Sequence, residues 1–294
     1  MASLEANGIT IEYEVHGTGD PILLVMGLAG QLVDWTPEFI GGLVERGHQV
    51  ITFDNRDSGL STEFDWTPPS HREGIRNHVL RREPDAGYLV DDMADDAAAL
   101  LEELSVESAH ILGISMGGMI SQALAIKHPG RVRSLTSIMS NTGDRKHGRV
   151  SMRLVAKALR LGRPTAETAV EYNTQVFQLI SGPHFDLEGF RARAQASFER
   201  SYRPLGASRQ TAAIAASPDR TEALGRVTAP TLVIHGLQDP LVKPSGGIAT
   251  ARAIPESRLL MLPDMGHAIP EPRRNEILDA VAVNAARARV PLPV

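Results

Sequence analysis

Cysteine is absent from this chain of 294 residues. Its absence excludes disulfides, thiolate zinc sites, iron–sulfur clusters and a cysteine nucleophile. Long apolar runs are missing as well, because the longest ones have the length of a strand and fall short of the roughly 20 residues of a membrane helix. The start of the chain lacks the basic segment and apolar run of a signal peptide. We therefore expect a soluble cytoplasmic protein with no membrane association.

An excess of positive charge is also lacking. Lys+Arg total 30 against an Asp+Glu total of 35, so the formal net charge is -5. Proteins that bind nucleic acid need concentrated positive charge to displace counterions, so we expect no nucleic-acid partner. Hydrophobic residues make up 42% and charged residues 22%, which is an ordinary balance for a globular protein with a substantial core.

Strand-like and helical patterns alternate along the first half of the chain. Continuous apolar runs, which suit strands covered on both faces, occur at 21–26, 50–53 and 109–112. Helical patterns occur at 37–46, 91–104 and 116–128, and a further strand is expected over 132–139. This alternation predicts a doubly wound parallel sheet, with the alternating segments near Leu4 and at 9–15 as paired edge strands.

The pattern changes between residues 144 and 226. Amphipathic helical stretches occur there at 152–161, 166–180, 187–202 and 209–216, without a convincing strand. The buried-strand pattern resumes at 231–234, followed by a helix at 246–253, a strand at 258–262 and a helix at 273–288. We therefore predict an α/β core made of 1–143 and 227–294, interrupted by a helical cap at 144–226. The connection 61–87 is long enough to carry function.

The sharpest motif is Gly113-Ile-Ser115-Met-Gly117, between an apolar strand and an apolar helix. Turning a strand directly into a helix strains the central residue and projects its side chain outward, and the flanking glycines leave room for the tight approach. The helix N-terminus then stabilises negative charge near that side chain. This context favours Ser115 as a nucleophile over a simple glycine-rich turn.

A serine nucleophile needs a base, and the base needs an acid that orients it. His267 lies in the loop after the last predicted strand, at the carboxyl edge where ligands bind. Asp239 follows the strand at 231–234, and the chain order of serine, acid and histidine suits this kind of site. Asp264 and Asp144 are the alternatives for the acid. We predict Asp239, because it directly follows a buried strand.

Acyl transfer also needs donors for the developing oxyanion. The residue after the nucleophile, Met116, supplies one expected backbone N–H group, and the glycine-containing turn 26–30 supplies the other, from Leu28. A phosphate-binding turn is the competing interpretation of 26–30. It is disfavoured because neither G-x-G-x-x-G nor a Gly-Lys-Ser/Thr ending is present.

Together these motifs resemble the α/β-hydrolase superfamily over nearly the whole chain. Within it, the chain looks like small bacterial esterases related to aclacinomycin methylesterase, which act on polyketide methyl esters. The resemblance implies an α/β-hydrolase fold: a mostly parallel, eight-stranded sheet with helices on both faces, a helical cap after the sixth strand, and no cofactor. The motifs that carry it are Met26-Gly27, Asp54-Asn-Arg56-Asp-Ser-Gly59-Leu-Ser61, the turn at Ser115, Gly236-Leu-Gln-Asp239 and Gly266-His267.

We therefore expect a serine hydrolase that cleaves a carboxylic ester through an acyl-enzyme, with a small hydrophobic ester-like molecule, such as a methyl ester or lactone, as substrate. No cofactor or metal is expected. The same triad also serves C–C bond hydrolases, lyases and perhydrolases, so these are alternative functions. A ligand-binding member of the fold without catalysis is a third hypothesis, and an incomplete triad would favour it.

Other features have two interpretations each. Four aspartates between residues 91 and 96 could suggest a cation site, but an acidic first helical turn on a solvated face explains them better. Several methionines near the motifs could line an adaptable apolar pocket or belong to the core. Two tryptophans could act as a lid or in packing, and a histidine near the predicted acid is expected to be structural. These residues are Asp91, Asp92, Asp95, Asp96, Met26, Met116, Met119, Met265, Trp35, Trp66 and His235.

Overall fold

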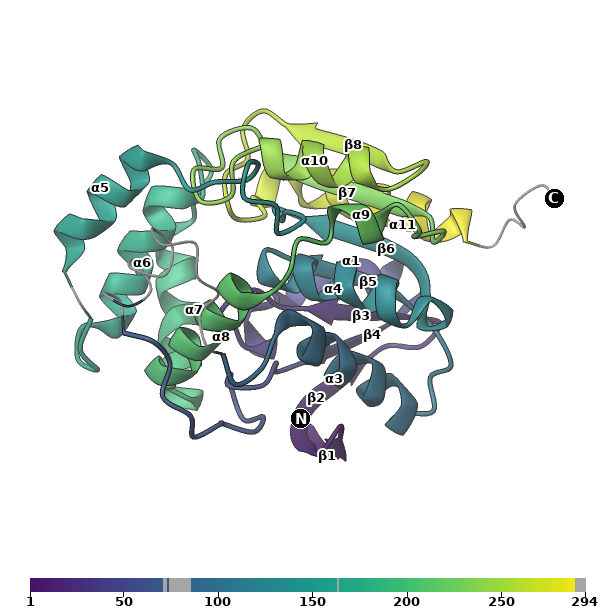
Figure 1. The fold of residues 1–294 in the computed structure, drawn as a ribbon, viewed down its shortest axis with the longest axis horizontal. Helices are drawn as coiled ribbons and strands as arrows, with labels where there is room; N and C mark the ends of the chain where they lie inside the picture. The colour runs from purple at the N-terminus through teal and green to yellow at the C-terminus, as the bar shows by residue number, and fades with distance from the viewer. Residues whose placement is uncertain (71–72, 74–85, 163, 289–294) are drawn as a thin grey trace.

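A computed structural model describes residues 1–70, 73, 86–162 and 164–288. At its centre is one eight-stranded sheet, in the order β1-β2-β4-β3-β5-β6-β7-β8 (Figure 1). β2 is antiparallel to both β1 and β4, and the other neighbouring pairs are parallel. This is the mostly parallel sheet that the resemblance implies. The strands are β1 (Ala2–Ala6), β2 (Ile9–His16), β3 (Asp20–Val25), β4 (His48–Phe53), β5 (Ala109–Ile114), β6 (Val132–Ile138), β7 (Thr231–Gly236) and β8 (Arg258–Leu262).

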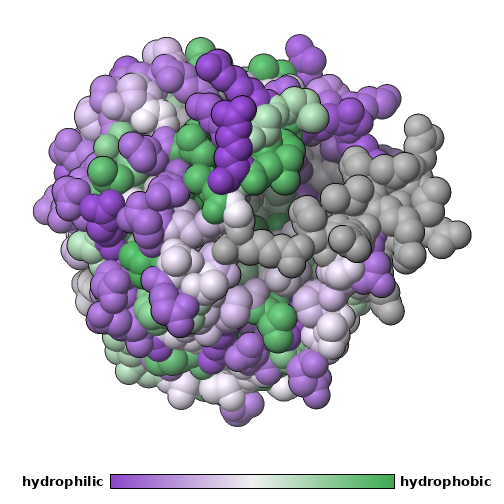
Figure 2. Space-filling model, turned by 90° about the vertical axis from the view of Figure 1, so that its left-hand side faces the viewer, coloured by the Kyte–Doolittle hydropathy of each residue, from purple (hydrophilic) through white to green (hydrophobic). Residues whose placement is uncertain are grey.

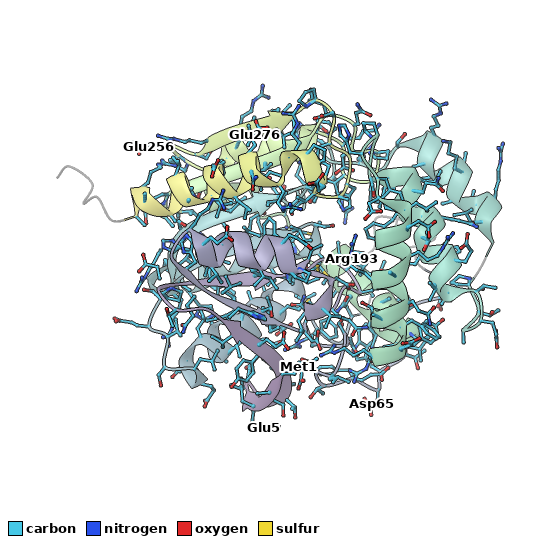
Figure 3. The ribbon with its side chains drawn as sticks, turned by 180° about the vertical axis from the view of Figure 1, so that it is seen from behind. Met1, Glu5, Asp65, Arg193, Glu256 and Glu276 are labelled. Atoms are coloured by element: carbon cyan, nitrogen blue, oxygen red, sulfur yellow. The ribbon has the colours of Figure 1, made fainter. Side chains whose placement is uncertain are left out.

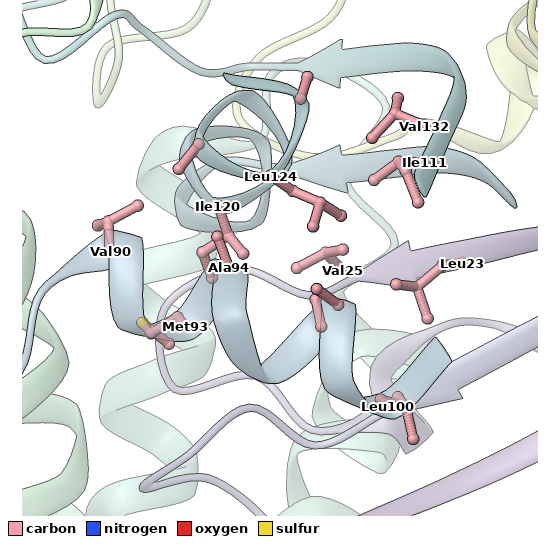
Figure 4. Packing of buried hydrophobic residues seen from close by; sticks show 14 of the residues in the cluster. Leu23, Val25, Val90, Met93, Ala94, Leu100, Ile111, Ile120, Leu124 and Val132 are labelled. Carbon is pink, nitrogen blue, oxygen red and sulfur yellow. The ribbon is translucent and has the colours of Figure 1, made fainter. Parts of the chain in front are cut away.

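Both faces of the sheet are covered, which explains the continuous apolar run in the central strand β3. In β3, Leu23 and Val25 pack in one core cluster, and the alternate residues Ile22 and Leu24 pack in another. Helices α3 (Val90–Glu103) and α4 (Met116–Lys127) cover the first face (Figure 4). Helices α1 (Pro37–Glu45) and α11 (Arg274–Arg287) cover the second. Figure 3, viewed from behind, shows α11 with Glu276 across that face. A strand buried on both sides has no polar face, so its sequence does not alternate.

Four longer helices lie between β6 and β7, at one end of the sheet (Figure 1). We call α5–α8 the inserted helices. In the described part of 144–226 they are accompanied by the short α9 (Thr221–Leu224) and by no strand. Phe177 of α6 and Phe190 of α7 stack with ring centroids 4.4 Å apart, which joins two of these helices. The inserted helices are α5 (Met152–Leu161), α6 (Ala169–Ile180), α7 (Leu187–Arg200) and α8 (Pro204–Ala216).

The helical pattern located these helices, but not all their ends. Helix α8 begins at Pro204, five residues before the predicted start at Arg209, because proline suits the first position of a helix. The long connection predicted at 61–87 lies partly outside the described residues. On the face shown in Figure 2, hydrophobic side chains appear between hydrophilic ones. The exposed apolar residues of the inserted helices include Met152, Leu159 and Leu205. The division into core and cap stays a prediction.

Candidate active site

Ser115 lies between the last residue of β5 and the first residue of α4, in a strained backbone conformation. Its φ is 53° and its ψ is -118°, a region that L-residues rarely adopt. The turn is tight enough to require its glycines. A Cβ on Gly113 would lie 2.1 Å from the carbonyl oxygen of Gly117, and a Cβ on Gly117 would lie 2.0 Å from the carbonyl oxygen of Val25. The motif therefore forms the strand–turn–helix that its sequence predicts.

Two consecutive hydrogen bonds connect Ser115 to His267 and His267 to Asp239, and the last two residues follow two other strands. His267 Nε2 lies 2.9 Å from Ser115 Oγ, and His267 Nδ1 lies 2.6 Å from Asp239 Oδ2. Asp239 follows β7 and His267 follows β8, so the parallel order of β5, β6, β7 and β8 brings all three residues to one edge. A carboxylate only accepts hydrogen bonds, so Nδ1 of His267 carries the proton. In the neutral ring, Nε2 is then free to accept the Ser115 hydroxyl proton.

Asp239 is held in place by its own surroundings. Its Oδ1 accepts hydrogen bonds from the backbone N–H groups of Leu241 and Val242, both at 2.9 Å. Burial raises the pKa of Asp239, but the neighbouring His235 and His267 rings outweigh this effect and leave the pKa below its ordinary value. The carboxylate is therefore ionised at neutral pH. Its orientation is fixed, because the backbone groups occupy one oxygen and leave the other to His267.

The two expected oxyanion donors lie in segments that approach Ser115. Met116 is the first residue of α4, where backbone N–H groups have no partner within the helix. The turn containing Leu28 passes close to the serine, because a Cβ on Gly27 would lie 3.3 Å from Ser115 Cβ. Among the described residues, the N–H groups of Leu28 and Met116 donate no hydrogen bond. Unpaired donors of this kind suit a developing oxyanion.

A sequence profile of the alpha/beta hydrolase fold matches residues 20–273. The chain belongs to the α/β-hydrolase family. Rhodomycin D methylesterase DnrP of Streptomyces peucetius is 28% identical over 304 residues, covering 94% of this chain and 95% of its own. The putative carbamate hydrolase RutD of Variovorax paradoxus is 29% identical over 262 residues, covering 88% of this chain and 89% of its own. Family membership and these relatives support hydrolase activity.

Solved structures share the architecture of this α/β hydrolase. The meta-cleavage product hydrolase CumD of Pseudomonas fluorescens matches with a TM-score of 0.74 at 20% identity, covering 98% of each chain. A thermophilic esterase from Thermogutta terrifontis matches with a TM-score of 0.71 at 23% identity, covering 99% of this chain and all of its own. At these identities the likeness supports the fold alone.

No helix in the described part of the chain is long and apolar enough to cross a membrane.

The two aspartates considered as alternatives to Asp239 form hydrogen bonds with residues other than His267. Asp264 accepts hydrogen bonds from Arg273 Nε at 2.9 Å and from His184 Nε2 at 2.8 Å, and these two partners lower its pKa to about 2. Asp144 bonds to the side chain of His147 in its own loop. Neither of these carboxylates has a hydrogen bond to His267, so Asp239 is the acid that contacts it.

The prediction of a solvated face was wrong for one aspartate of α3. Asp96 is 2% exposed, and its Oδ2 lies 2.6 Å from Nε of Arg56, which follows β4. Asn7 also donates to Asp96, at 2.8 Å. The helix turns this carboxylate toward the sheet, where an ion pair compensates its burial. Among the described residues, no group of three His, Asp or Glu side chains is arranged to hold a metal ion.

The methionines, the tryptophans and His235 are buried, except Trp66, which is partly buried. The four methionines are at most 7% exposed, so they belong to the core. Trp35 stacks on Phe39 and Trp66 meets Tyr88 edge-on, which assigns both tryptophans to packing. His235 is fully buried, and its Nε2 donates to the carbonyl oxygen of Val242 at 2.7 Å. Its predicted structural role agrees with this contact. The four methionines are Met26, Met116, Met119 and Met265.

Sequence reasoning missed the contacts between this site and the inserted helices. The backbone N–H of His267 donates to the carbonyl oxygen of Ile180, the last residue of α6, at 2.7 Å. The N–H of Gly266 donates to the carbonyl oxygen of Ser181 at 3.1 Å. These bonds use backbone atoms, so no side-chain pattern predicts them. They fix the loop of His267 against the inserted helices.

Proposed function

We propose that this protein is a serine hydrolase that cleaves carboxylic esters through an acyl-enzyme. Ser115 is the nucleophile, His267 the base and Asp239 the acid that orients the base. The observation that carries the proposal is the hydrogen-bonded series Ser115–His267–Asp239, with the serine at a strained strand–helix turn. Strain of this kind persists where a function requires it.

The reaction proceeds in two steps. His267 Nε2 takes the proton of Ser115 Oγ as the oxygen attacks the ester carbonyl carbon. The N–H groups of Met116 and Leu28 donate to the carbonyl oxygen as it becomes an oxyanion. When the intermediate collapses, the C–O bond to the alcohol breaks and His267 gives its proton to the leaving oxygen. A water molecule, deprotonated by His267, then attacks the acyl-enzyme; the acid departs and Ser115 regains its proton.

The substrate we propose is a small hydrophobic molecule with a methyl ester or lactone group. Two relatives of this chain, at 28% and 27% identity, bear the name rhodomycin D methylesterase, which supports ester cleavage. The inserted helices and residues 144–226 as a whole would form the cap over the acyl or alcohol group. A relative at 26% identity is named as a putative non-heme bromoperoxidase, so perhydrolase activity with the same triad is the second candidate.

Labelling with a fluorophosphonate tests the nucleophile without knowledge of the substrate. We expect one adduct per chain, located on Ser115 by peptide mass spectrometry and abolished in Ser115→Ala. A panel of methyl esters, lactones, C–C cleavage substrates and peracid-forming conditions then separates the candidate reactions. If Ser115 is labelled but only C–C cleavage substrates are turned over, the protein is a C–C bond hydrolase and the ester proposal fails. Absence of labelling in the folded protein would favour a binding protein without catalysis.

A further inference from the structure

The turn that carries Leu28 has an unusual backbone. The N–H of Gly30 donates to the carbonyl oxygen of Gly27 at 3.1 Å, which closes a four-residue turn with Leu28 and Ala29 in its centre. Ala29 has a φ of 59°. A positive φ at the third residue and not at the second, Leu28, indicates a type II turn, which favours glycine at the third position. An L-residue at this position is strained, so another contact has to hold the turn in this form.

That contact comes from the inserted helix α8. Gln210 is fully buried. Its Oε1 accepts the N–H of Ala29 at 2.8 Å, and its Nε2 donates to the carbonyl oxygen of Arg56, also at 2.8 Å. An N–H group needs an acceptor and a carbonyl needs a donor, so the amide fits both partners in one orientation only. Gln210 therefore joins the turn to the segment after β4.

The bond to Gln210 depends on which way the Leu28–Ala29 peptide faces. A type I turn keeps the closing bond between the first and fourth residues, avoids a positive φ, and differs chiefly by a flip of the central peptide. That flip would turn the carbonyl oxygen of Leu28 toward Oε1 of Gln210 in place of the Ala29 N–H. Two acceptors would then face each other in a buried site. The amide of Gln210 thus opposes the relaxation of the turn.

A second inserted helix holds the same segment at its end. Gln31 Nε2 donates to the carbonyl oxygens of Ser197 at 2.7 Å and Ser201 at 2.9 Å, at the end of α7. Arg200 Nη1 donates to Oε1 of the same glutamine at 2.7 Å. Gln31 fixes where the segment leaves the turn. Gln210 is the contact that is specific for the peptide within the turn.

We propose that Gln210 is a positioning residue for the oxyanion donor Leu28, acting through the Leu28–Ala29 peptide. This inference rests on the proposed function. The flip rotates the chain about the Cα–C bond of Leu28 and the N–Cα bond of Ala29, directly next to the peptide that carries the Leu28 N–H. Loss of the amide therefore lets the turn rearrange and lets that donor shift from the oxygen that develops beside Ser115. Displacements near 1 Å in such a site lower rates by about 10²-fold. A residue that only supported the fold would change stability without a specific effect on kcat.

The variant Gln210→Met tests this role, because methionine keeps the length of the side chain and removes both hydrogen bonds. We expect kcat for p-nitrophenyl butyrate to fall by about 10- to 100-fold, with KM changed by less than about threefold. The pH at which activity declines on acidification should stay at its wild-type value. Thr211→Ala, at an exposed neighbouring position of α8, is the matched control and should keep the wild-type kcat. A wild-type kcat in Gln210→Met overturns the inference.

A rescue in the turn separates positioning from general support. In Gln210→Met, the second change Ala29→Gly removes the strain of the positive φ, and we expect it to restore kcat by about five- to thirtyfold. A cap that was merely loosened would gain nothing from a glycine in the turn, so absence of rescue contradicts the inference. If Gln210→Met does not fold, Gln210→Glu keeps an oxygen for the Ala29 N–H. Its kcat should then stay within about tenfold of wild type, and a greater loss counts against the inference.

Fluorophosphonate labelling distinguishes the failure of this inference from failure of the proposed function. If wild-type protein is not labelled at Ser115, the proposed function fails and the inference fails with it. If wild type is labelled and turns over the ester while Gln210→Met keeps full kcat, only the inference fails.

Discussion

Replacing Asp239 by asparagine would test how His267 is held in its active form. The backbone N–H groups of Leu241 and Val242 both donate to Asp239 Oδ1, so they would bind the amide oxygen of an asparagine and turn its NH₂ group toward His267. His267 Nδ1 would then accept a hydrogen bond, and the proton of the neutral ring would move to Nε2, facing Ser115. A ring in this tautomer cannot take the serine proton. The expected loss in kcat is about 10⁴-fold, or about 5.4 kcal/mol of transition-state stabilisation.

The assay compares kcat for p-nitrophenyl butyrate, and urea unfolding, for wild type, Asp239→Asn and Asp239→Ala. Both variants should lose activity. Asp239→Asn should keep nearly the wild-type free energy of unfolding, because it still accepts the two backbone hydrogen bonds. Asp239→Ala leaves both N–H groups unpaired and should be less stable by about 2 kcal/mol or more. Asp264→Asn is the control for an acid outside the triad. A kcat of Asp239→Asn within about tenfold of wild type would refute the reasoning.

Three further predictions concern stability. Because Ser115 has a positive φ, Ser115→Gly should unfold with a free energy about 1 kcal/mol higher than that of Ser115→Ala in urea; equal values would argue against backbone strain at the turn. Arg209→Met removes the guanidinium that lies 2.9 Å from buried Asp57, while the hydrogen bonds from Tyr88 and Phe64 to Asp57 remain. The free energy of unfolding in urea should therefore fall by about 3 kcal/mol. Adding Asp57→Asn to Arg209→Met should restore at least about 1 kcal/mol of the free energy of unfolding, because it removes the unpaired buried charge. A further decrease in that free energy would contradict a charge effect. Asp264, with its pKa lowered from 3.8 to about 2, should contribute stability above pH 4 that is lost as pH falls toward 2. Asp264→Asn should flatten that part of the curve, and an unchanged slope would assign it to other groups.

The sequence predicted the parts of the site that depend on local chain chemistry. Ser115, Asp239 and His267 each follow a strand with a recognisable apolar run. Parallel strands place their carboxyl ends at one edge, so the order of the motifs was enough to expect that they meet. The catalytic roles of these residues stay a proposal, but their placement agrees with the predicted chain order.

Contacts between distant segments were not predictable in the same way. Gln210 is 181 residues from Ala29 in sequence, and a buried glutamine on an amphipathic helix gives no signal of its partner. The same limit explains Asp96, because a helical pattern gives the apolar stripe but not the cation, Arg56, that arrives from another strand end. The start of α8 at Pro204 was missed because the apolar period there is weak. For Gln210 and Asp96 the deciding physics is a pairing of buried polar groups across the fold.

The central claim is that Ser115 attacks an ester, and hydrolysis of p-nitrophenyl acetate and butyrate by wild type and Ser115→Ala tests it most directly. The account predicts turnover by wild type and none above background by the variant, with both proteins folded. Equal rates in the two proteins would remove Ser115 from the mechanism and contradict the account.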